Sequence, residues 1–449
     1  MEFSSLYFLY LFLPLTLLVY FLVPGLRLKN IVLLAASLLF YAMGQPVYVL
    51  LLVGLSYANF AMARRIRPGK RNTLLLPVVV NLAVLGLFKY LDFFLGIFGI
   101  TVADGGVMLA ALRGITNGLN SIGFAFRSPT SALPLGLSFY AFQVISYVAD
   151  VYRGKVKAER SFFNLLLYLS MFPKMMQGPI VRYEQVARQL MDRRTTPRAA
   201  FEGAQRFIIG LAKKVLLADY AGKVVASLST GGGNGTFVGA WLAALMFMFQ
   251  IYFDFSGYSD MAVGLGLLFV IRLPENFNYP YCAASLSAFW RRWHMSLSGW
   301  FRDYLHIPLD GNRRGTLRTM CNKLLVFLAT GLWHGNGLTF VLWGLWHGLW
   351  SCVETALHLP KKLERKWYGH VYTILVVIFG FALFRAASPA QGFALWRAML
   401  TGFHADNVCR AAISTALDAR NLAQCVLALV LCMPAAPALR AKLERLRCA

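Results

Sequence analysis

Long apolar stretches separated by short polar segments run along almost the whole chain. The clearest of them are Ser5–Pro24, Thr73–Tyr90, Pro134–Tyr152, Phe237–Phe255 and Val371–Phe384. Each is long enough, or nearly so, for the roughly 20 apolar residues that a hydrocarbon core requires. Because lipid offers no hydrogen-bond partner to a free backbone amide, stretches of this kind are predicted to be helices. The pattern therefore predicts an all-α, polytopic integral membrane protein with about ten or more transmembrane helices.

Composition and charge agree with a membrane location. Hydrophobic residues make up 58% of the chain and charged residues 14%, whereas soluble domains carry roughly 25% charged residues. The formal charge of +25 would suit a nucleic-acid partner, but Lys and Arg occupy short loops such as Arg64–Arg71 rather than one basic domain. Basic loops on alternate sides are typical of membrane proteins that are oriented by cytoplasmic positive charge. They predict no nucleic-acid partner and an N-terminus outside the cytoplasm.

Two segments depart from the pattern of plain spans. Phe162–Val181 is apolar, but Pro173 and Pro179 interrupt it and basic residues flank both of its ends. Irregular backbone at membrane depth requires protein or a watery cavity around it, so this segment is predicted to be re-entrant and to form a cavity wall. Leu286–Leu309 carries aromatic residues at three- and four-residue steps, with polar residues on its other faces. That pattern predicts one interfacial amphipathic helix, although the aromatic residues would also suit simple membrane-surface anchors.

One histidine interrupts a long apolar run near the C-terminal third of the chain. His334 lies within Leu324–Trp350, follows Trp333 and precedes Gly335 and Gly337. An ionisable residue at that depth is costly unless it faces a polar interior, and the glycines allow backbone or ligand to approach closely. His334 is therefore predicted to be a general base in a narrow tunnel. The alternative is a structural histidine that is hydrogen-bonded between helices.

Two further histidines are candidates for the same site. His347 repeats the Trp-His-Gly motif thirteen residues after His334. On an unbroken helix that separation amounts to about 20 Å of rise and roughly 220° of rotation, so His347 is predicted to be structural unless the helix breaks at Gly335–Gly337. His294 follows Trp293 and two arginines. Burial or cationic neighbours would keep its imidazole neutral, which suits a second catalytic residue, a binding group or a structural histidine.

The remaining chemistry-bearing residues are few. Asp254 and Asp260 interrupt strongly apolar sequence, so they are expected to line the cavity or to pair with Arg292 or Arg302. Seven cysteines without a CxxC pair indicate neither a disulfide framework nor a metal site. No nucleotide-binding, zinc-protease or serine-hydrolase motif stands in a credible context, so no bound cofactor is predicted.

Several long motifs together resemble the bacterial branch of the membrane-bound O-acyltransferase (MBOAT) family. The motifs are Pro134–Gln143, Tyr147–Gly154, Gln177–Tyr183, Tyr252–Met261, Pro274–Tyr281, Phe289–Leu305, Gly311–Gly315, Gly331–Gly335 and Phe384–Ala386. The resemblance is greatest to the members that act in alginate O-acetylation, and it extends to members in peptidoglycan O-acetylation and teichoic-acid D-alanylation. Asp310 and Thr330 stand where glycine is expected, and the pattern fades beyond about residue 401.

The resemblance implies a fold, a site and a reaction. The fold would be a ring of helices around a central funnel, with the catalytic core in residues 134–385 of a single domain, 1–449. His334 would match the catalytic histidine and His294 the second signature histidine. The residues expected to contact substrate are Trp333, Asn336, Trp293, Arg302 and Asp254. The donor would be acetyl-CoA in the cytoplasm, and the acetyl group would leave toward the outer face.

The resemblance also implies a setting. The protein would reside in the bacterial inner membrane, and a separate periplasmic acetyltransferase would pass the acetyl group to an envelope polysaccharide. Two other function classes remain open: a non-catalytic channel for an acyl donor or lipid, and a scaffold subunit of an envelope polymer machine. Either would survive the loss of His334, whereas an acyltransferase would not.

Overall fold

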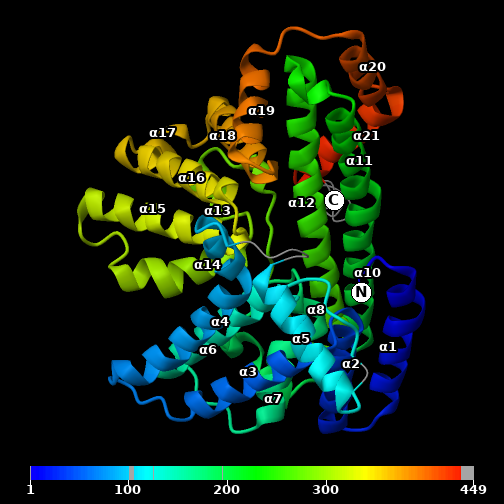
Figure 1. Ribbon diagram of the computed structural model, residues 1–449, viewed down its shortest axis with the longest axis vertical. Coiled ribbons are helices and arrows are strands. Elements are labelled where there is room, and N and C mark those ends of the chain that lie inside the picture. Colours follow the sequence, from blue (N-terminus) through cyan, green and yellow to red (C-terminus); the bar gives the residue numbers. More distant parts are fainter. Residues whose placement is uncertain (1, 101–105, 125, 195, 436–449) are drawn as a thin grey trace, which may run out of the picture. The chain divides into compact units, whose positions relative to one another are not determined.

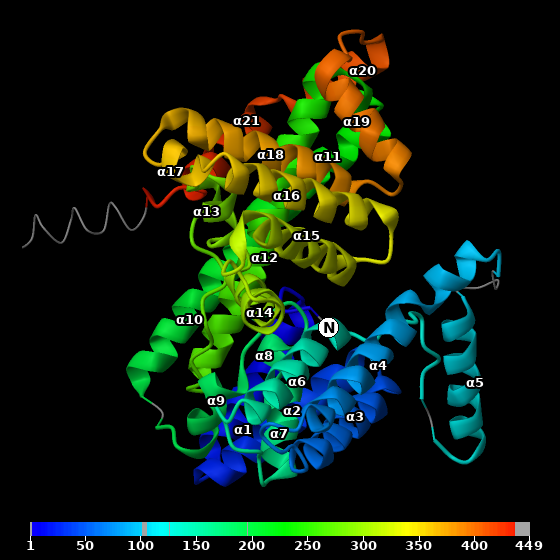
Figure 2. The ribbon, with the colours of Figure 1, turned by 90° about the vertical axis from the view of Figure 1, so that its left-hand side faces the viewer.

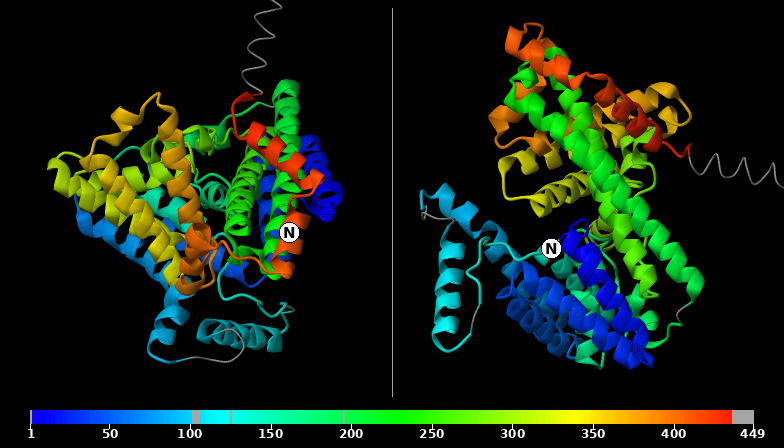
Figure 3. Two further views of the ribbon diagram at one scale, coloured as in Figure 1. Left: turned by 90° about the horizontal axis from the view of Figure 1, so that it is seen from above. Right: turned by 90° about the vertical axis from the view of Figure 1, so that its right-hand side faces the viewer.

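The computed structural model describes residues 2–100, 106–124, 126–194 and 196–435. Within those ranges the chain is helical and contains no strand, as the apolar pattern predicted (Figure 1). Contacts divide the chain into two compact units. The first comprises Met1–Leu211 and Tyr258–Pro274, and the second comprises Ala212–Gly257 and Glu275–Ala449. Helix α12 (Phe237–Leu268) runs unbroken through 32 residues and contributes to both units (Figure 3).

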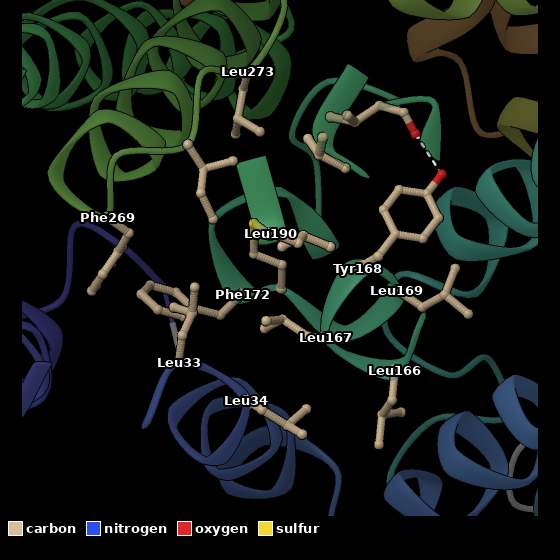
Figure 4. Close-up of a cluster of buried hydrophobic side chains, with 14 of the residues drawn as sticks. Leu33, Leu34, Leu166, Leu167, Tyr168, Leu169, Phe172, Leu190, Phe269 and Leu273 are labelled. Atoms are coloured by element: carbon tan, nitrogen blue, oxygen red, sulfur yellow. Dashed lines mark hydrogen bonds between the residues drawn. The ribbon is translucent and has the colours of Figure 1, made fainter. Parts of the chain in front are cut away.

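The first unit is built from the N-terminal helices. They are α1 (Leu13–Leu22), α2 (Leu26–Gly44), α3 (Tyr48–Ala63), α4 (Arg71–Ile97), α5 (Val107–Ser121), α6 (Leu137–Tyr152), α7 (Phe162–Ser170), α8 (Phe172–Met175), α9 (Tyr183–Met191) and α10 (Pro197–Ala212). Their core gathers leucine and phenylalanine side chains around α7 and α8 (Figure 4). The ring of Phe172 packs 5.5 Å from the rings of both Phe12 and Phe40. Aromatic packing of this kind anchors the irregular α7–α8 segment within protein rather than lipid.

The proline-interrupted segment is broken where the sequence indicated. Helix α7 ends at Ser170, Met171 takes a non-helical conformation, and α8 lasts only from Phe172 to Met175. The Tyr168 hydroxyl donates to the carbonyl oxygen of Val181 at 2.8 Å (Figure 4). This hydrogen bond connects α7 to the non-helical segment after α8. A backbone group of this irregular segment thus finds its hydrogen-bond partner within the protein, which irregular backbone at membrane depth requires.

The second unit contains the helices that carry the candidate histidines. They are α11 (Asp219–Thr230), α13 (Leu286–Trp290), α14 (Met295–Phe301), α15 (Gly315–His334), α16 (Leu338–Ala356), α17 (Leu359–Leu363), α18 (Trp367–Arg385), α19 (Pro389–Thr401), α20 (Asn407–Ala416) and α21 (Ala419–Leu431). Helices α15, α16 and α18 pack side by side (Figure 2). These three helices carry His334, Trp343 and Phe384, respectively, which belong to the candidate site.

The close approach of α15 and α16 depends on glycines. A Cβ atom on Gly331 would lie 2.3 Å from the carbonyl oxygen of Phe340, and one on Gly344 would lie 2.5 Å from the carbonyl oxygen of Phe327. Neither distance is compatible with a side chain, so only glycine permits this backbone contact. Such small-residue interfaces are the usual means of bringing helices close in membranes.

The structure contains fewer clear candidate membrane spans among its described residues than the sequence predicted. Four helices of the described residues are long and apolar enough to cross a membrane: Leu26–Gly44, Arg71–Gly96, Phe237–Leu268 and Trp367–Arg385. Shorter apolar helices are Phe8–Leu22, Tyr48–Ala63 and Ala419–Leu431. The prediction of ten or more spans thus stays a prediction, because many apolar stretches form helices shorter than a bilayer requires.

The prediction of one amphipathic helix over Leu286–Leu309 is wrong. Helix α13 ends at Trp290 and α14 begins at Met295, so four residues of turn separate them. His294 in that turn has φ +43°, in the left-handed region that a continuous helix does not allow. The predicted stripe did not reveal the turn, because Phe289 lies in α13, Trp293 in the turn and Trp300 in α14. The six cysteines of the described part are free thiols, and Cys448 lies outside it.

Candidate active site

His334 lies at a helix end rather than within a helix. It is the last residue of α15, Gly335–Gly337 form the turn, and α16 begins at Leu338 and runs back along α15. The separation of His334 from His347 applied only to an unbroken helix, and the break at Gly335–Gly337 removes it because the chain reverses between the two residues. Both imidazoles pack against the ring of Trp343, with centroids 5.1 Å and 5.0 Å from it.

Aromatic rings surround His334. Besides Trp343, its imidazole contacts the ring of Trp333 at 4.9 Å and that of Phe384 at 5.3 Å. The second signature histidine reaches the same wall, since the His294 ring lies 5.9 Å from Trp333. The structure thus brings His334 and His294 against the same tryptophan ring, although 40 residues separate them in the sequence. Apolar walls of this kind exclude water, which favours acyl transfer over hydrolysis.

His294 is held in one orientation and one tautomer. Its side chain is fully buried, and Nδ1 lies 3.1 Å from Oδ1 of Asn276. The same oxygen accepts from the backbone N–H of Ser296 at 3.2 Å and from its hydroxyl at 2.9 Å. An oxygen that accepts these bonds requires Nδ1 to carry the proton, so the lone pair lies on Nε2. Nε2 is buried and has no hydrogen-bond partner among the described residues.

The environment keeps His294 uncharged. Burial lowers its pKa well below the usual value, and repulsion by charge on His334 lowers the pKa further. A neutral imidazole with a free lone pair can accept a hydrogen bond from a substrate hydroxyl. This is the electrostatic state that the sequence predicted for His294, although the dominant cause is burial rather than the neighbouring arginines.

Asn276 was not singled out from the sequence as a site residue. It lies in the motif Pro274–Tyr281, and its backbone carbonyl also accepts from the N–H of Met295 at 2.9 Å. The side-chain and backbone oxygens of Asn276 therefore fix the turn that orients the imidazole of His294. A signal existed, since Asn is a residue that commonly satisfies local backbone donors, but only the fold shows that those donors belong to residues 295 and 296.

We expect Asn276→Ala to slow acyl transfer roughly 10- to 100-fold, because small misplacements of a reacting group cost that much. The effect should fall on kcat more than on the KM of the donor. Asn276→Asp keeps an acceptor oxygen and should recover part of the rate. Steady-state kinetics of the two variants tests this, and equal rates for Asn276→Ala and wild type would contradict the orienting role.

The other predicted site residues are not all at the histidines. Trp293 is buried and stacks on Phe289, within a cluster of the second core. Asn336 is exposed in the turn after His334. Trp293 is thus part of the hydrophobic core next to His294, whereas Asn336 lies on the exposed turn after His334.

The two charged candidates are engaged in ion pairs. Asp254 pairs with Lys214, whose Nζ lies 2.7 Å from its Oδ1, rather than with Arg292 or Arg302. Arg302 pairs with its neighbour Asp303 at 2.7 Å. Asp260 pairs with Arg206 at 2.7 Å. Among the described residues no group of His, Cys, Asp and Glu side chains is arranged to hold a metal ion.

A cavity of about 290 Å³ opens between α13–α14 and α15–α16. Its polar lining includes the cationic side chains of Arg291, Arg302 and Lys323, and its apolar lining includes Trp290 and Phe327. The Trp290 ring lies 5.7 Å from Trp343, which in turn contacts His334. Trp290, which lines the cavity, and Trp343 thus connect the cavity to His334 through direct ring contacts.

The site of this helical, apolar chain is an aromatic wall that contacts one fully buried histidine, His294, and one half-buried histidine, His334. The family model for the membrane-bound O-acyltransferase family, MBOAT, matches residues 155–388, and the chain belongs to that family. The protein is an O-acyltransferase. The resemblance noted from the motifs is thereby confirmed.

Three relatives indicate where the chain stands within the family. It is 40% identical to the probable alginate O-acetylase AlgI of Pseudomonas putida, over 89% of this chain and 80% of the relative. It is 33% identical to the peptidoglycan O-acetyltransferase of Helicobacter pylori, over 91% of this chain and 81% of the relative. It is 28% identical to the teichoic acid D-alanyltransferase of Bacillus subtilis, over 56% of this chain and 68% of the relative. All three names describe modification of an envelope polymer.

Proposed function

We propose that this protein takes an acetyl group from acetyl-CoA in the cytoplasm and delivers it across the inner membrane for O-acetylation of an envelope polysaccharide of the alginate type. The observation that carries the proposal is the packing of both His334 and His294 against the ring of Trp333. The names of the relatives support the choice of an acetyl group and a polysaccharide. The catalytic core of the proposal is residues 134–385.

The proposed reaction is direct transfer. His334 accepts the proton of an acceptor hydroxyl as the hydroxyl oxygen attacks the thioester carbonyl carbon. The resulting tetrahedral intermediate collapses, the carbon–sulfur bond breaks, and the thiolate takes up the proton from His334 as it leaves. His294 accepts a hydrogen bond through its Nε2 lone pair from a second hydroxyl of the acceptor and so orients the attacking hydroxyl toward the thioester. The aromatic wall excludes competing water.

The donor site of the proposal is the cavity between α13–α14 and α15–α16. Arg291, Arg302 and Lys323 would bind phosphate groups, for which guanidinium groups are well suited. Trp290 and Phe327 would contact the apolar part of the thioester arm. A periplasmic acetyltransferase is proposed as the partner that receives the group on the outer side.

We expect Arg291→Gln and Arg302→Gln each to raise the KM for acetyl-CoA roughly two- to fivefold without changing kcat, since exposed charge pairs contribute modestly. Both effects should shrink at high salt. Initial rates at varied acetyl-CoA test this. Arg410→Gln, on the exposed surface of α20, is the matched control, and an equal KM change in that variant would remove the case for this cavity.

The proposed function is tested by labelled acetyl-CoA turnover with purified protein in nanodiscs, in the presence of a periplasmic partner encoded nearby. Consumption of the donor with label on an acceptor supports an acetyltransferase. A wild-type protein that never consumes the donor under these conditions would favour the channel or scaffold alternatives. A protein that consumes D-alanyl or longer acyl thioesters instead would correct the acyl group while retaining the reaction.

A further inference from the structure

A cavity of about 560 Å³ lies within the first unit, at the beginnings of α2 and α7 and the end of α9. Leu34, Leu167 and Leu190 line it, and all three belong to the core around α7 and α8 (Figure 4). The cavity shares no lining residue with the donor cavity between α13–α14 and α15–α16. None of the candidate site residues lines it. The proposed reaction therefore leaves this cavity without a role.

Three further lining side chains are large, apolar and exposed, and together they form the apolar wall of the cavity. Ile31 of α2 is 58% exposed, Phe163 of α7 is 67% exposed and Met191 of α9 is 62% exposed. Exposed apolar surface of this kind marks a place where a protein meets a membrane or a partner. Because the chain belongs to a membrane-bound family, the apolar wall is suited to a lipid acyl chain.

Basic residues gather at the three helix ends that border the cavity. They are Arg27 and Lys29 in α2, Lys157 and Arg160 before α7, and Arg188, Arg193 and Arg194 in and after α9. The acidic residues of the same segments are Glu159, Glu184 and Asp192, and none of them lines the cavity. Clusters of Lys and Arg mark the cytoplasmic end of membrane helices. The cavity therefore lies at the cytoplasmic surface of the membrane.

Arg27 supplies the positive charge of the lining. It is exposed, and no ion pair engages it within the described part of the chain. Arg193, in contrast, is engaged by the protein, because its guanidinium donates to Oδ1 of Asn30 at 2.7 Å and to the carbonyl oxygen of Gln189 at 3.0 Å. Ser161, whose hydroxyl caps α7, adds a polar group to the lining. One uncompensated guanidinium thus lies beside the apolar wall.

We infer that this cavity binds an anionic phospholipid of the cytoplasmic leaflet, with the phosphate at Arg27 and an acyl chain along the apolar wall. The inference goes beyond the proposed function and is independent of it. Guanidinium groups bind phosphate through parallel hydrogen bonds, and basic pockets between membrane helices on the cytoplasmic side hold phosphate headgroups. The volume lies within the range of small-molecule sites, about 300–1,000 Å³. A free phosphate ion would leave the apolar wall uncovered, whereas a phospholipid covers both parts of the cavity.

The experiment measures lipid binding to the full chain in a neutral detergent by native mass spectrometry, without an acyl donor. The probes are dioleoyl phosphatidylglycerol, dioleoyl phosphatidylcholine and glycerol phosphate, which carries the phosphate without acyl chains. We expect phosphatidylglycerol to bind about fivefold more tightly than phosphatidylcholine, since one basic residue near a membrane surface contributes about that factor. Glycerol phosphate should bind more weakly than either lipid.

Three variants test the two parts of the cavity separately. Arg27→Gln should abolish the preference for phosphatidylglycerol and keep the binding of phosphatidylcholine. Arg71→Gln, at an exposed position in α4 outside the cavity, is the matched charge control and should keep the preference. Phe163→Ser, which retains Arg27, should weaken the binding of both lipids by the same factor.

Four results would overturn the lipid site. They are equal affinity of the wild-type protein for the two lipids, a preference that persists in Arg27→Gln, a preference lost equally in Arg71→Gln, and unchanged lipid affinity in Phe163→Ser. Glycerol phosphate that binds as tightly as phosphatidylglycerol would also overturn it, in favour of a site for a free phosphate ion.

Discussion

His334→Ala is expected to lower the rate of acyl transfer by about 10²–10⁴-fold, the usual contribution of a general base. The imidazole packs against Trp333, Trp343 and Phe384. The other two histidines at these rings, His294 and His347, are fully buried. Initial rates of labelled thioester consumption measure the effect. His334→Gln, which keeps a polar side chain of similar length, should be equally inactive.

Two controls make the loss interpretable. His404→Ala replaces an exposed histidine in the segment before α20 and should leave the rate unchanged. Thermal unfolding followed by size-exclusion chromatography should give the same midpoint for His334→Ala and wild type. A His334→Ala protein that is folded and retains most of its activity would disprove the base role, whatever the donor proves to be.

Glu354→Leu is expected to destabilise the protein strongly and to reduce activity with it. The Glu354 side chain is fully buried. Its Oε1 accepts from the backbone N–H of Leu286 at 2.5 Å, and its Oε2 accepts from the N–H and hydroxyl of Ser287 at 2.9 Å and 2.6 Å. Each donor left unsatisfied costs roughly 1–3 kcal/mol. Because these residues begin α13, which leads into the turn of His294, the loss should also misplace the imidazole of His294.

The measurement is the thermal midpoint together with kcat. Glu354→Gln keeps one acceptor oxygen and the shape of the side chain, so its midpoint should lie between those of wild type and Glu354→Leu. Glu364→Gln, at an exposed position, is the matched control and should behave as wild type. A Glu354→Leu protein with an unchanged midpoint would show that α13 does not depend on this contact.

The contribution of Glu354 could have been suspected from the sequence. It is a carboxylate within the apolar helix Leu338–Ala356, and such residues in membranes usually have a fixed partner. The partner itself was not predictable, because Leu286 and Ser287 are 68 and 67 residues away. Backbone donors at a helix start attract a carboxylate wherever it comes from in the chain.

The condition that the sequence analysis set for His347, a helix break at Gly335–Gly337, is met, and the structural role predicted for His347 stays a prediction. Helix geometry separates residues thirteen apart only while the helix continues, and the turn at Gly335–Gly337 ends it. Once α16 folds back along α15, His347 packs against the same tryptophan as His334. A Cβ on Gly380 would lie 2.5 Å from Nε2 of His347, so α18 also leaves room for this ring. The sequence contained the glycines but not the direction of the chain after them.

By itself the sequence determined the helical class, the membrane location and the family, because apolar length and long motifs are local properties of the chain. The tertiary structure alone decided that His334 and His294 share Trp333, that Asn276 sets the tautomer of His294, and that a cavity opens between α13–α14 and α15–α16. Those features depend on helix reversals and side-chain contacts between distant segments, and such contacts leave no periodic trace in a single sequence.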